Sequence, residues 1–237
     1  MSLDENRRSG NAAWPRIDAL SSNIPGTKLW WCTLDASADE IGRWSEILSP
    51  AERARAARFG MPFLRDRYVV GRTALRTVLA EALGLAPREV PIVRGVRGRP
   101  RLDGDSRLDF NVSHTAGVAL IGLTDAGRIG VDIERRDRAI NVSGIARKFL
   151  SEAERARLAP MRADDARRAV LTLWTCKEAM SKATGDALSA PFARIDVDLR
   201  EGRRLRDGPD RYDPARWTLH ATDIPPDHIA TVALWRP

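Results

Sequence analysis

The chain has 237 residues, of which 43% are hydrophobic and 30% are charged, a balance typical of a globular protein with a real core. A formal net charge of +7 favours acidic partners, whereas only two cysteines and three histidines argue against a disulfide framework and a histidine-rich metal centre. No apolar run is long enough to span a bilayer, and the polar N-terminus lacks a signal-peptide core, so we expect a cytoplasmic protein.

The first half of the chain predicts a polar segment followed by one lobe. Residues 1–26 are expected to form a flexible tail. The lobe, residues 27–126, begins with the apolar strand KLWWCTLDA. Ser49 then fits the N-cap of a helix, with Glu52 completing a capping box. A longer helix ends at Gly84, and the lobe closes with strands in FNVSHTAGVALIGL.

The second half, residues 127–237, repeats this pattern. LSPAERAR at 48–55 returns as LSEAERAR at 150–157, an offset of 102. The strand RIGVDIERR at 128–136 precedes this repeat and the helix AVLTLWTCKEAMSKATG at 169–185 follows it, each at nearly the same offset from its counterpart in the first half. The strands ARIDVDLR and HIATVALWRP come last. REGRRLRDGPDRYDP reads as a charged loop. The repeat predicts an α+β fold of two similar lobes, each a small sheet packed with helices.

The strand in GRIGVDIERR carries two acids side by side. Val131 and Ile133 alternate as a buried face should, and the same period places Asp132 and Glu134 together on the other face. A water-facing surface explains this pattern as well as a metal site does. ARIDVDLR shows the same alternation at Asp196, so spacing alone does not separate the two interpretations.

Three further stretches carry candidate functional residues. Glu178 and Lys182 in WTCKEAMSK lie four apart on one helix face, where an ordinary surface ion pair is the alternative. Ser113 and His114 lie in the strand FNVSHT, where a packed histidine is the alternative. RGVRGRPRL at 94–102 is a basic loop that could equally be a solvated turn.

Taken in order, these stretches form a specific series. It consists of GRP at 98–100, FNVSHT at 110–115, IGVDIE at 129–134 and WTCKEAMSK at 174–182. The series resembles the 4′-phosphopantetheinyl transferases, in particular their long, two-lobed class that activates carrier proteins of biosynthetic synthases. Arg99 stands where that family usually has lysine, which preserves attraction for phosphate. The resemblance implies a duplicated fold with the active site between the lobes.

The resemblance also implies the reaction and its residues. Such an enzyme transfers the phosphopantetheine arm of coenzyme A to a serine of an apo acyl or peptidyl carrier protein and releases adenosine 3′,5′-bisphosphate. We expect a transferase of the holo-acyl-carrier-protein synthase type that requires Mg²⁺. Asp132, Glu134 and Glu178 would hold the ion, since Mg²⁺ prefers oxygen ligands. Glu178 would also accept the serine proton, and Lys182 would stabilise the leaving group.

Binding of coenzyme A is assigned, by the same resemblance, to basic and polar residues of both lobes. They are Arg55, Arg67, Arg99, Ser113, His114 and, in a supporting role, Lys177. The expected protein partners are carriers with an acidic surface, and no nucleic acid or membrane. Because the two fused lobes supply the interface that a one-lobe protein makes by self-association, we expect a monomer.

Two rival functions use parts of the same evidence. A basic nucleic-acid-binding protein would explain the charge but none of the ordered motifs, and the arginines alternate with acids instead of forming a block. A metal-dependent phosphohydrolase would use the same carboxylates. A hydrolase triad of Ser113, His114 and an aspartate is disfavoured, because neighbours on a strand point to opposite faces.

Overall fold

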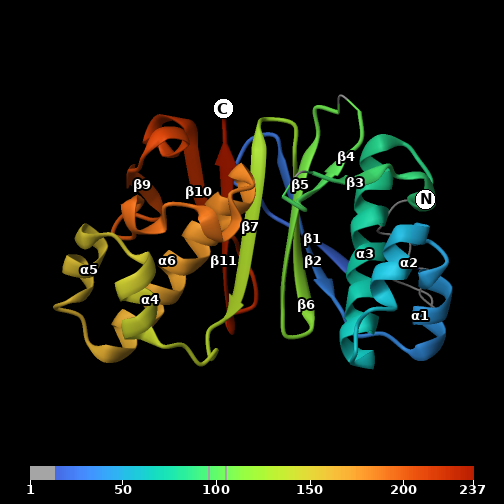
Figure 1. Cartoon of the computed structure of the whole chain (residues 1–237), viewed down its shortest axis with the longest axis horizontal. Coiled ribbons are helices and arrows are strands. Elements are labelled where there is room, and N and C mark those ends of the chain that lie inside the picture. The colour runs from blue at the N-terminus through green and yellow to red at the C-terminus, as the bar shows by residue number, and fades with distance from the viewer. Residues whose placement is uncertain (1–13, 96, 105) are drawn as a thin grey trace.

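The computed structural model describes residues 14–95, 97–104 and 106–237. It contains two main antiparallel sheets between outer helices (Figure 1). The first sheet has the order β1-β2-β6-β5, with β1 (Ile17–Leu20), β2 (Thr27–Thr33), β5 (Asp109–Thr115) and β6 (Val118–Thr124). The second has the order β10-β11-β7, with β7 (Arg128–Arg135), β10 (Trp217–Ala221) and β11 (His228–Trp235).

Helices cover the outer side of each sheet (Figure 1). The first lobe has α1 (Ala38–Ser45), α2 (Pro50–Ala56) and α3 (Pro62–Leu83); the second has α4 (Val142–Phe149), α5 (Glu152–Leu158) and α6 (Ala163–Thr184). Two hairpins complete the fold, β3 (Ile92–Arg94) with β4 (Pro100–Leu102), and β8 (Asp196–Asp198) with β9 (Arg204–Asp207). Short 3₁₀ turns lie at Pro87–Glu89, Ala187–Ser189, Phe192–Arg194, Asp210–Tyr212 and Pro214–Arg216. The predicted α+β class is confirmed.

The two lobes share their helix chemistry. Ser49 caps α2 and Ser151 caps α5, each within a complete capping box. Helices α3 and α6 each have 22 residues and end at a left-handed glycine, Gly84 with φ of 67° and Gly185 with φ of 78°. Glycine adopts this conformation without a Cβ clash, which makes it the favoured residue after a helix. These elements confirm the predicted repeat.

Three apolar cores hold the fold together. One lies between α3 and the first sheet, and a second between α6 and the second sheet. The third joins the sheets, with Leu29 and Leu120 from the first lobe packed against the odd-numbered residues of β7, Ile129, Val131 and Ile133. Because those odd positions are buried between the sheets, the even positions of β7 face the other way, toward α6.

Two expectations about loose segments need correction. The tail expected over residues 1–26 includes β1, which pairs with β2 and buries Ile17, so the first lobe begins before residue 27. Residues 1–13 lie outside the described part of the chain. The loop expected at 200–214 contains β9 and a 3₁₀ turn, because Leu205 and Tyr212 anchor it in the second core. Within the described residues, no helix combines the length and hydropathy needed to cross a membrane.

Candidate active site at the lobe junction

The two lobes are joined by a row of side-chain hydrogen bonds, which we call the β5–β7 seam. Backbone N–H groups of β7 donate to side chains of β5: Ile129 to Asp109 Oδ2 at 2.8 Å, Val131 to Asn111 Oδ1 at 3.0 Å and Ile133 to Ser113 Oγ at 3.3 Å. As the edge of its own sheet, β7 would otherwise leave these buried donors unpaired. The seam therefore fixes the register of β7 against the first lobe.

Close approach of α6 brings the second lobe's charged side chains to β7. A Cβ at Gly130 would lie 1.8 Å from the carbonyl oxygen of Ala179, so only glycine permits this contact. Glu178 and Lys182 flank that contact on α6, and Asp132 follows Gly130 on the same strand face. Asp132 is only 5% exposed, which excludes the water-facing interpretation for this acid.

The carboxylate of Asp132 is bound asymmetrically. Its Oδ1 accepts the hydroxyl of Ser113 at 2.9 Å and the ammonium of Lys182 at 2.7 Å. Lys182 Nζ also donates to Ser113 Oγ at 2.9 Å and to the carbonyl of Val131 at 3.2 Å. The other oxygen, Oδ2, is buried and has no hydrogen-bond partner among the described residues. A buried carboxylate oxygen without a partner is costly unless a ligand completes it.

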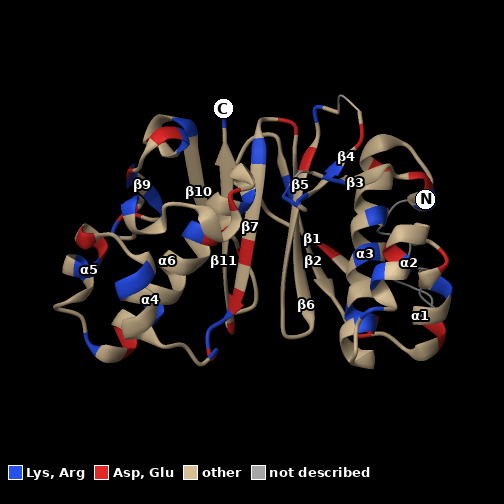
Figure 2. Cartoon of the chain, in the orientation of Figure 1, with Lys and Arg blue, Asp and Glu red and all other residues tan. Residues whose placement is uncertain are grey.

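Two further acids share this environment. Burial raises the pKa of Glu134, while Arg138, its ion-pair partner, lowers it. Burial also raises the pKa of Glu178, and the nearby charge of Asp132 raises it further. Asp132 and Lys182 act on the pKa of both glutamates, so the three acids and the lysine form one electrostatic group. Figure 2 shows acidic positions along β7, in the middle of the molecule.

The three acids do not form a closed metal cage. Among the described residues, no three His, Cys, Asp or Glu side chains lie close enough together to hold an ion. Lys182 binds Asp132, and Arg138 binds Glu134 instead. The donor chemistry nevertheless fits Mg²⁺, which takes few carboxylates and completes its shell with water and substrate phosphate. The partnerless Oδ2 of Asp132 supplies one such donor.

The predicted nucleotide contacts of the first lobe lie near the end of β5. His114 is exposed, but the protein around its ring removes enough water to lower its pKa, and Lys182 lowers that pKa further. Arg67 of α3 reaches the turn after β5, where its Nη2 lies 3.4 Å from the Cβ position at Gly117. Arg55 of α2 lies over the ring of Tyr68 at 5.9 Å. His114 thus borders one end of the site, whereas Arg67 lies at the turn beyond β5, where it pairs with Asp35 at 3.8 Å.

Arg99 lies inside the lobe junction. Its guanidinium donates to both oxygens of Asp109 at 2.8 Å, to the carbonyl of Phe110 at 3.1 Å and to that of Ile129 at 2.8 Å. The side chain is 12% exposed. Arg99 therefore ties β5 to β7 at the foot of the seam, a role that its place in a basic loop does not reveal. Its predicted contact with phosphate stays a prediction.

Lys177 lies away from the junction. Its side chain is fully buried, pairs with Glu154 at 2.9 Å and donates to the carbonyls of Phe192 at 2.7 Å and Ile195 at 2.5 Å. With every donor used inside the second lobe, Lys177 is not placed to contact coenzyme A, and the supporting role expected for it needs correction. One residue along a helix turns the side chain by about 100°, which separates Lys177 from Glu178.

Sequence reasoning overlooked other residues at the junction. Arg138 pairs with Glu134, and Asn111 and Asp109 form the seam. Asn111 lies within the FNVSHT motif, two residues before Ser113, and this spacing indicates that both side chains lie on the same face of the strand. Nothing in the sequence pattern singles out Arg138 among the many arginines.

Strand β8, whose acids alternate with apolar residues as those of β7 do, places its two aspartates in a different environment. Asp196 accepts the hydroxyl of Ser151 at 3.1 Å and pairs with Arg157. Hydrogen bonds from Arg200 hold the pKa of Asp198 well below its ordinary value. Both acids are thus neutralised by arginines of their own lobe and belong to the scaffold.

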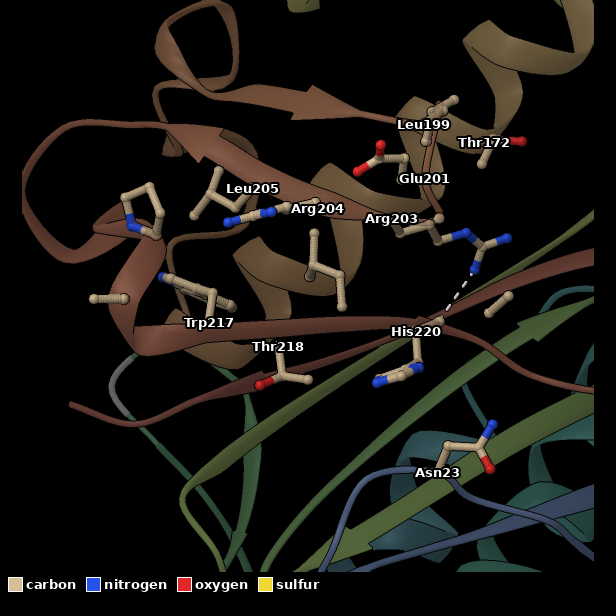
Figure 3. Close-up of a pocket in the computed structure, with 15 residues that line it drawn as sticks. Asn23, Thr172, Leu199, Glu201, Arg203, Arg204, Leu205, Trp217, Thr218 and His220 are labelled. Atoms are coloured by element: carbon tan, nitrogen blue, oxygen red, sulfur yellow. Dashed lines mark hydrogen bonds between the residues drawn. The ribbon is translucent and has the colours of Figure 1, made fainter.

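A groove of about 950 Å³ also opens on the second lobe (Figure 3). Trp217, Leu205 and Thr172 are among its lining residues, and Arg203 crosses it to donate to the carbonyl of His220 at 3.2 Å. None of the predicted site residues lines this groove. The candidate site is therefore the lobe junction, where acids, a lysine and a histidine meet.

Fold and site together define a two-lobed α+β protein with a cluster of ionisable residues at the junction of the lobes. A family model described as the 4′-phosphopantetheinyl transferase superfamily matches residues 128–233, and a second, described as the N-terminal part of 4′-phosphopantetheinyl transferase, matches residues 33–124. The two matches meet near the start of β7, where the lobes divide.

Curated relatives agree with the family models. The 4′-phosphopantetheinyl transferase HetI of Nostoc sp. is 31% identical over 233 residues, which cover 94% of each chain. A putative 4′-phosphopantetheinyl transferase of Synechocystis sp. is 30% identical over 90% of this chain and 86% of its own. The transferase Sfp of Bacillus subtilis is 28% identical over 79% of this chain and 83% of its own. The chain belongs to the 4′-phosphopantetheinyl transferase superfamily, in its long, two-lobed class.

Proposed function

We propose a division of labour for the reaction of this 4′-phosphopantetheinyl transferase, which moves the phosphopantetheine arm of coenzyme A to a carrier protein. The proposal rests on one observation: three elements bring together Asp132, Ser113 and Lys182, and the Oδ2 atom of Asp132 has no hydrogen-bond partner among the described residues. The second lobe supplies the acids for the chemistry, and the first lobe supplies groups that hold the nucleotide.

Asp132, Glu134 and Glu178 are the residues that would hold Mg²⁺. The bound ion would offset the negative charge that develops on the pyrophosphate during transfer. The ammonium of Lys182 forms an ion pair with Asp132, and the guanidinium of Arg138 forms one with Glu134. Both cations keep these acids from repelling one another while the protein is free of substrate.

Glu178 is the proposed general base. Its carboxylate shares one electrostatic environment with Asp132 and Lys182, beside the place where the serine must enter. The serine oxygen of the carrier bonds to the phosphorus that bears pantetheine, and the serine proton passes to Glu178. The bond between that phosphorus and the bridging oxygen breaks, and adenosine 3′,5′-bisphosphate leaves. Lys182, which faces the same site, would stabilise the negative charge on the departing phosphate.

The first lobe would hold the nucleotide end of coenzyme A. His114 borders the site, and Arg67 at the turn after β5 and Arg55 on α2 would extend this surface with groups that bind phosphate. Because His114 has a lowered pKa, its neutral ring would donate one hydrogen bond instead of adding a charge at neutral pH.

The relatives favour one subtype and one kind of partner. Their names, HetI and Sfp among them, point to the two-lobed transferases and away from the narrower holo-acyl-carrier-protein synthase type. The net charge of +7 supports an acidic carrier protein as partner. The expectations of a monomer and of a cytoplasmic location stay predictions.

The test is a panel of apo-carrier proteins incubated with coenzyme A and Mg²⁺, followed by mass spectrometry of the carrier. We expect the mass of the arm to appear on a serine, whereas a phosphohydrolase would leave the carrier unchanged. Asp132→Ala should abolish most of the transfer and leave the protein folded, by circular dichroism. Asp196→Ala, on the look-alike strand, is the matched control and should keep most of it. Equal losses from the two changes, or full activity in chelator, would contradict the assignment.

A further inference from the structure

Ser113 has no hydrogen-bonding capacity left for a ligand. Its hydroxyl donates to Asp132 Oδ1 at 2.9 Å and accepts from Lys182 Nζ at 2.9 Å and from the N–H of Ile133 at 3.3 Å. A serine hydroxyl offers one donor and two acceptor lone pairs, so all three are used. The residue is also only 4% exposed. A contact with the nucleotide would have to break one of these bonds.

We propose that Ser113 is a positioning residue for Asp132, holding the carboxylate by Oδ1 so that Oδ2 faces the divalent cation. The inference rests on the proposed function, and it replaces the coenzyme A contact that the family resemblance implies for this serine. It also makes a residue of the first lobe responsible for the metal affinity of the second.

The geometry explains why Lys182 alone does not suffice. The terminal torsion of an aspartate is broad, so a carboxylate held by one flexible ammonium can turn about its Cβ–Cγ bond. Ser113 adds a second donor to the same oxygen from a different direction, on a short side chain whose strand is fixed by the seam. Partners of this kind, which orient a ligand without touching the metal, typically change metal affinity by about 10- to 100-fold.

The chain offers a matched control on the same strand. Asn111 is buried as Ser113 is and also accepts a backbone N–H of β7, but its seam bond goes to Val131 and not to Asp132. Asn111→Ala therefore loosens the seam without removing a donor from the carboxylate. If Ser113 acted only by docking β5 onto β7, the two alanine variants would behave alike.

The experiment measures binding, not turnover. Full-length wild type, Ser113→Ala, Ser113→Thr and Asn111→Ala are titrated with Mn²⁺ alone, and free Mn²⁺ is followed by electron paramagnetic resonance. We expect the Kd for Mn²⁺ to rise about tenfold in Ser113→Ala. It should stay near the wild-type value in Asn111→Ala and return toward it in Ser113→Thr, which keeps the hydroxyl. In chelator, the affinity for adenosine 3′,5′-bisphosphate should be unchanged in Ser113→Ala.

Three outcomes would overturn the inference. One is wild-type Mn²⁺ affinity in Ser113→Ala, and another is an equal loss in Asn111→Ala, which would assign the effect to seam docking. The third is weaker nucleotide binding by Ser113→Ala in chelator with Mn²⁺ affinity intact, which would make the serine a ligand contact. Failure of the wild type itself to bind Mn²⁺, both alone and with coenzyme A present to supply its phosphates, would instead remove the metal site of the proposed function, and this inference with it.

Discussion

The two lobes share a buried ion pair at corresponding positions, Arg76 with Glu52 and Lys177 with Glu154. In the first, Arg76 binds Glu52 at 2.7 Å and donates to carbonyls of the segment after α3, among them Pro87 at 2.9 Å. In the second, Lys177 binds Glu154 at 2.9 Å and donates to carbonyls of the segment after α6. In both lobes the acid closes a capping box, and the cation ties the long helix to the chain that follows it.

The neighbouring positions differ between the lobes. Glu178 corresponds to Thr77 of the first lobe, whose hydroxyl donates to the carbonyl of Thr73 at 3.0 Å within its own helix. Asp132 corresponds to Trp30, which packs in the first core. The duplicated scaffold thus keeps its buried ion pair twice, whereas at the positions of Asp132 and Glu178 only the second lobe carries acids. Lys177 and Glu178 are neighbours in the chain, yet one serves the scaffold and the other the site.

The largest loss of stability is expected from breaking the ion pair of the second lobe, Lys177 with Glu154. Lys177→Met leaves Glu154 buried without a cation, which should lower the free energy of unfolding by about 3–5 kcal/mol, measured by urea denaturation. Burial already raises the pKa of Glu154 above its ordinary 4.5, and loss of Lys177 would raise it further. The folded variant then holds a proton that the unfolded chain releases, so its stability should fall as pH rises above 4.5.

A double variant separates charge from packing in this pair. In Lys177→Met with Glu154→Gln no uncompensated charge remains, so we expect part of the lost stability to return and the pH dependence to flatten. If the double variant is no more stable than Lys177→Met at neutral pH, the loss comes from packing or from the carbonyl contacts, and the ion-pair argument is wrong.

The comparison of Glu178 with Thr77 gives the next largest effect. Glu178→Gln should lower kcat by about 10²-fold or more at saturating Mg²⁺ and coenzyme A, the usual scale for a lost general base. Thr77→Val, at the corresponding helix position, should leave kcat near the wild-type value. A rise in KM for coenzyme A with kcat unchanged in Glu178→Gln would make this residue a binding group instead of a base.

Regular patterns in the sequence account for what could be predicted. The capping boxes at Ser49 and Ser151 and the alternation around Asp132 are local signals, and each corresponds to an observed element. Their common offset predicted two lobes, because equal local patterns make equal elements. The ordered motifs also predicted the family. Local pattern was therefore sufficient for the fold class and for the strand and helix that carry the acids.

Contacts distant in the chain account for what was missed. Lys177 was interpreted as a site residue because it is the neighbour of Glu178 in the sequence. Its ion-pair partner, Glu154, lies on another helix, and the sequence around Lys177 does not show that contact. Arg99 was interpreted as a basic loop residue, and its hydrogen bond to the carbonyl of Ile129 exists only because β5 meets β7. Strand β1 is four residues long and is stabilised by pairing with β2, so its own sequence signals little.

A smaller loss of stability is expected when Arg72, the second arginine that pairs with Glu52, is replaced. Glu52 is bound by Arg72 at 2.9 Å as well as by Arg76. Arg72→Met therefore leaves the acid paired and should lower the free energy of unfolding by about 1 kcal/mol, the scale of one ion pair that is not fully buried, in urea denaturation. The contrast with Lys177→Met tests whether a second cation protects the buried acid. A loss as large as that of Lys177→Met would show that Arg76 does not compensate.

The smallest expected effect concerns His114, the ionisable residue that the first lobe brings to the end of the site. Burial and Lys182 lower its pKa from the ordinary 6.5, so below that pH the unfolded chain binds more protons than the folded one. Wild-type stability should therefore decline as pH falls through this range, and His114→Asn should decline less. Thermal unfolding of both proteins from neutral pH down to about pH 5 measures the difference. Parallel curves would mean that His114 titrates as it does in the unfolded chain, and that the charges of the second lobe do not reach it.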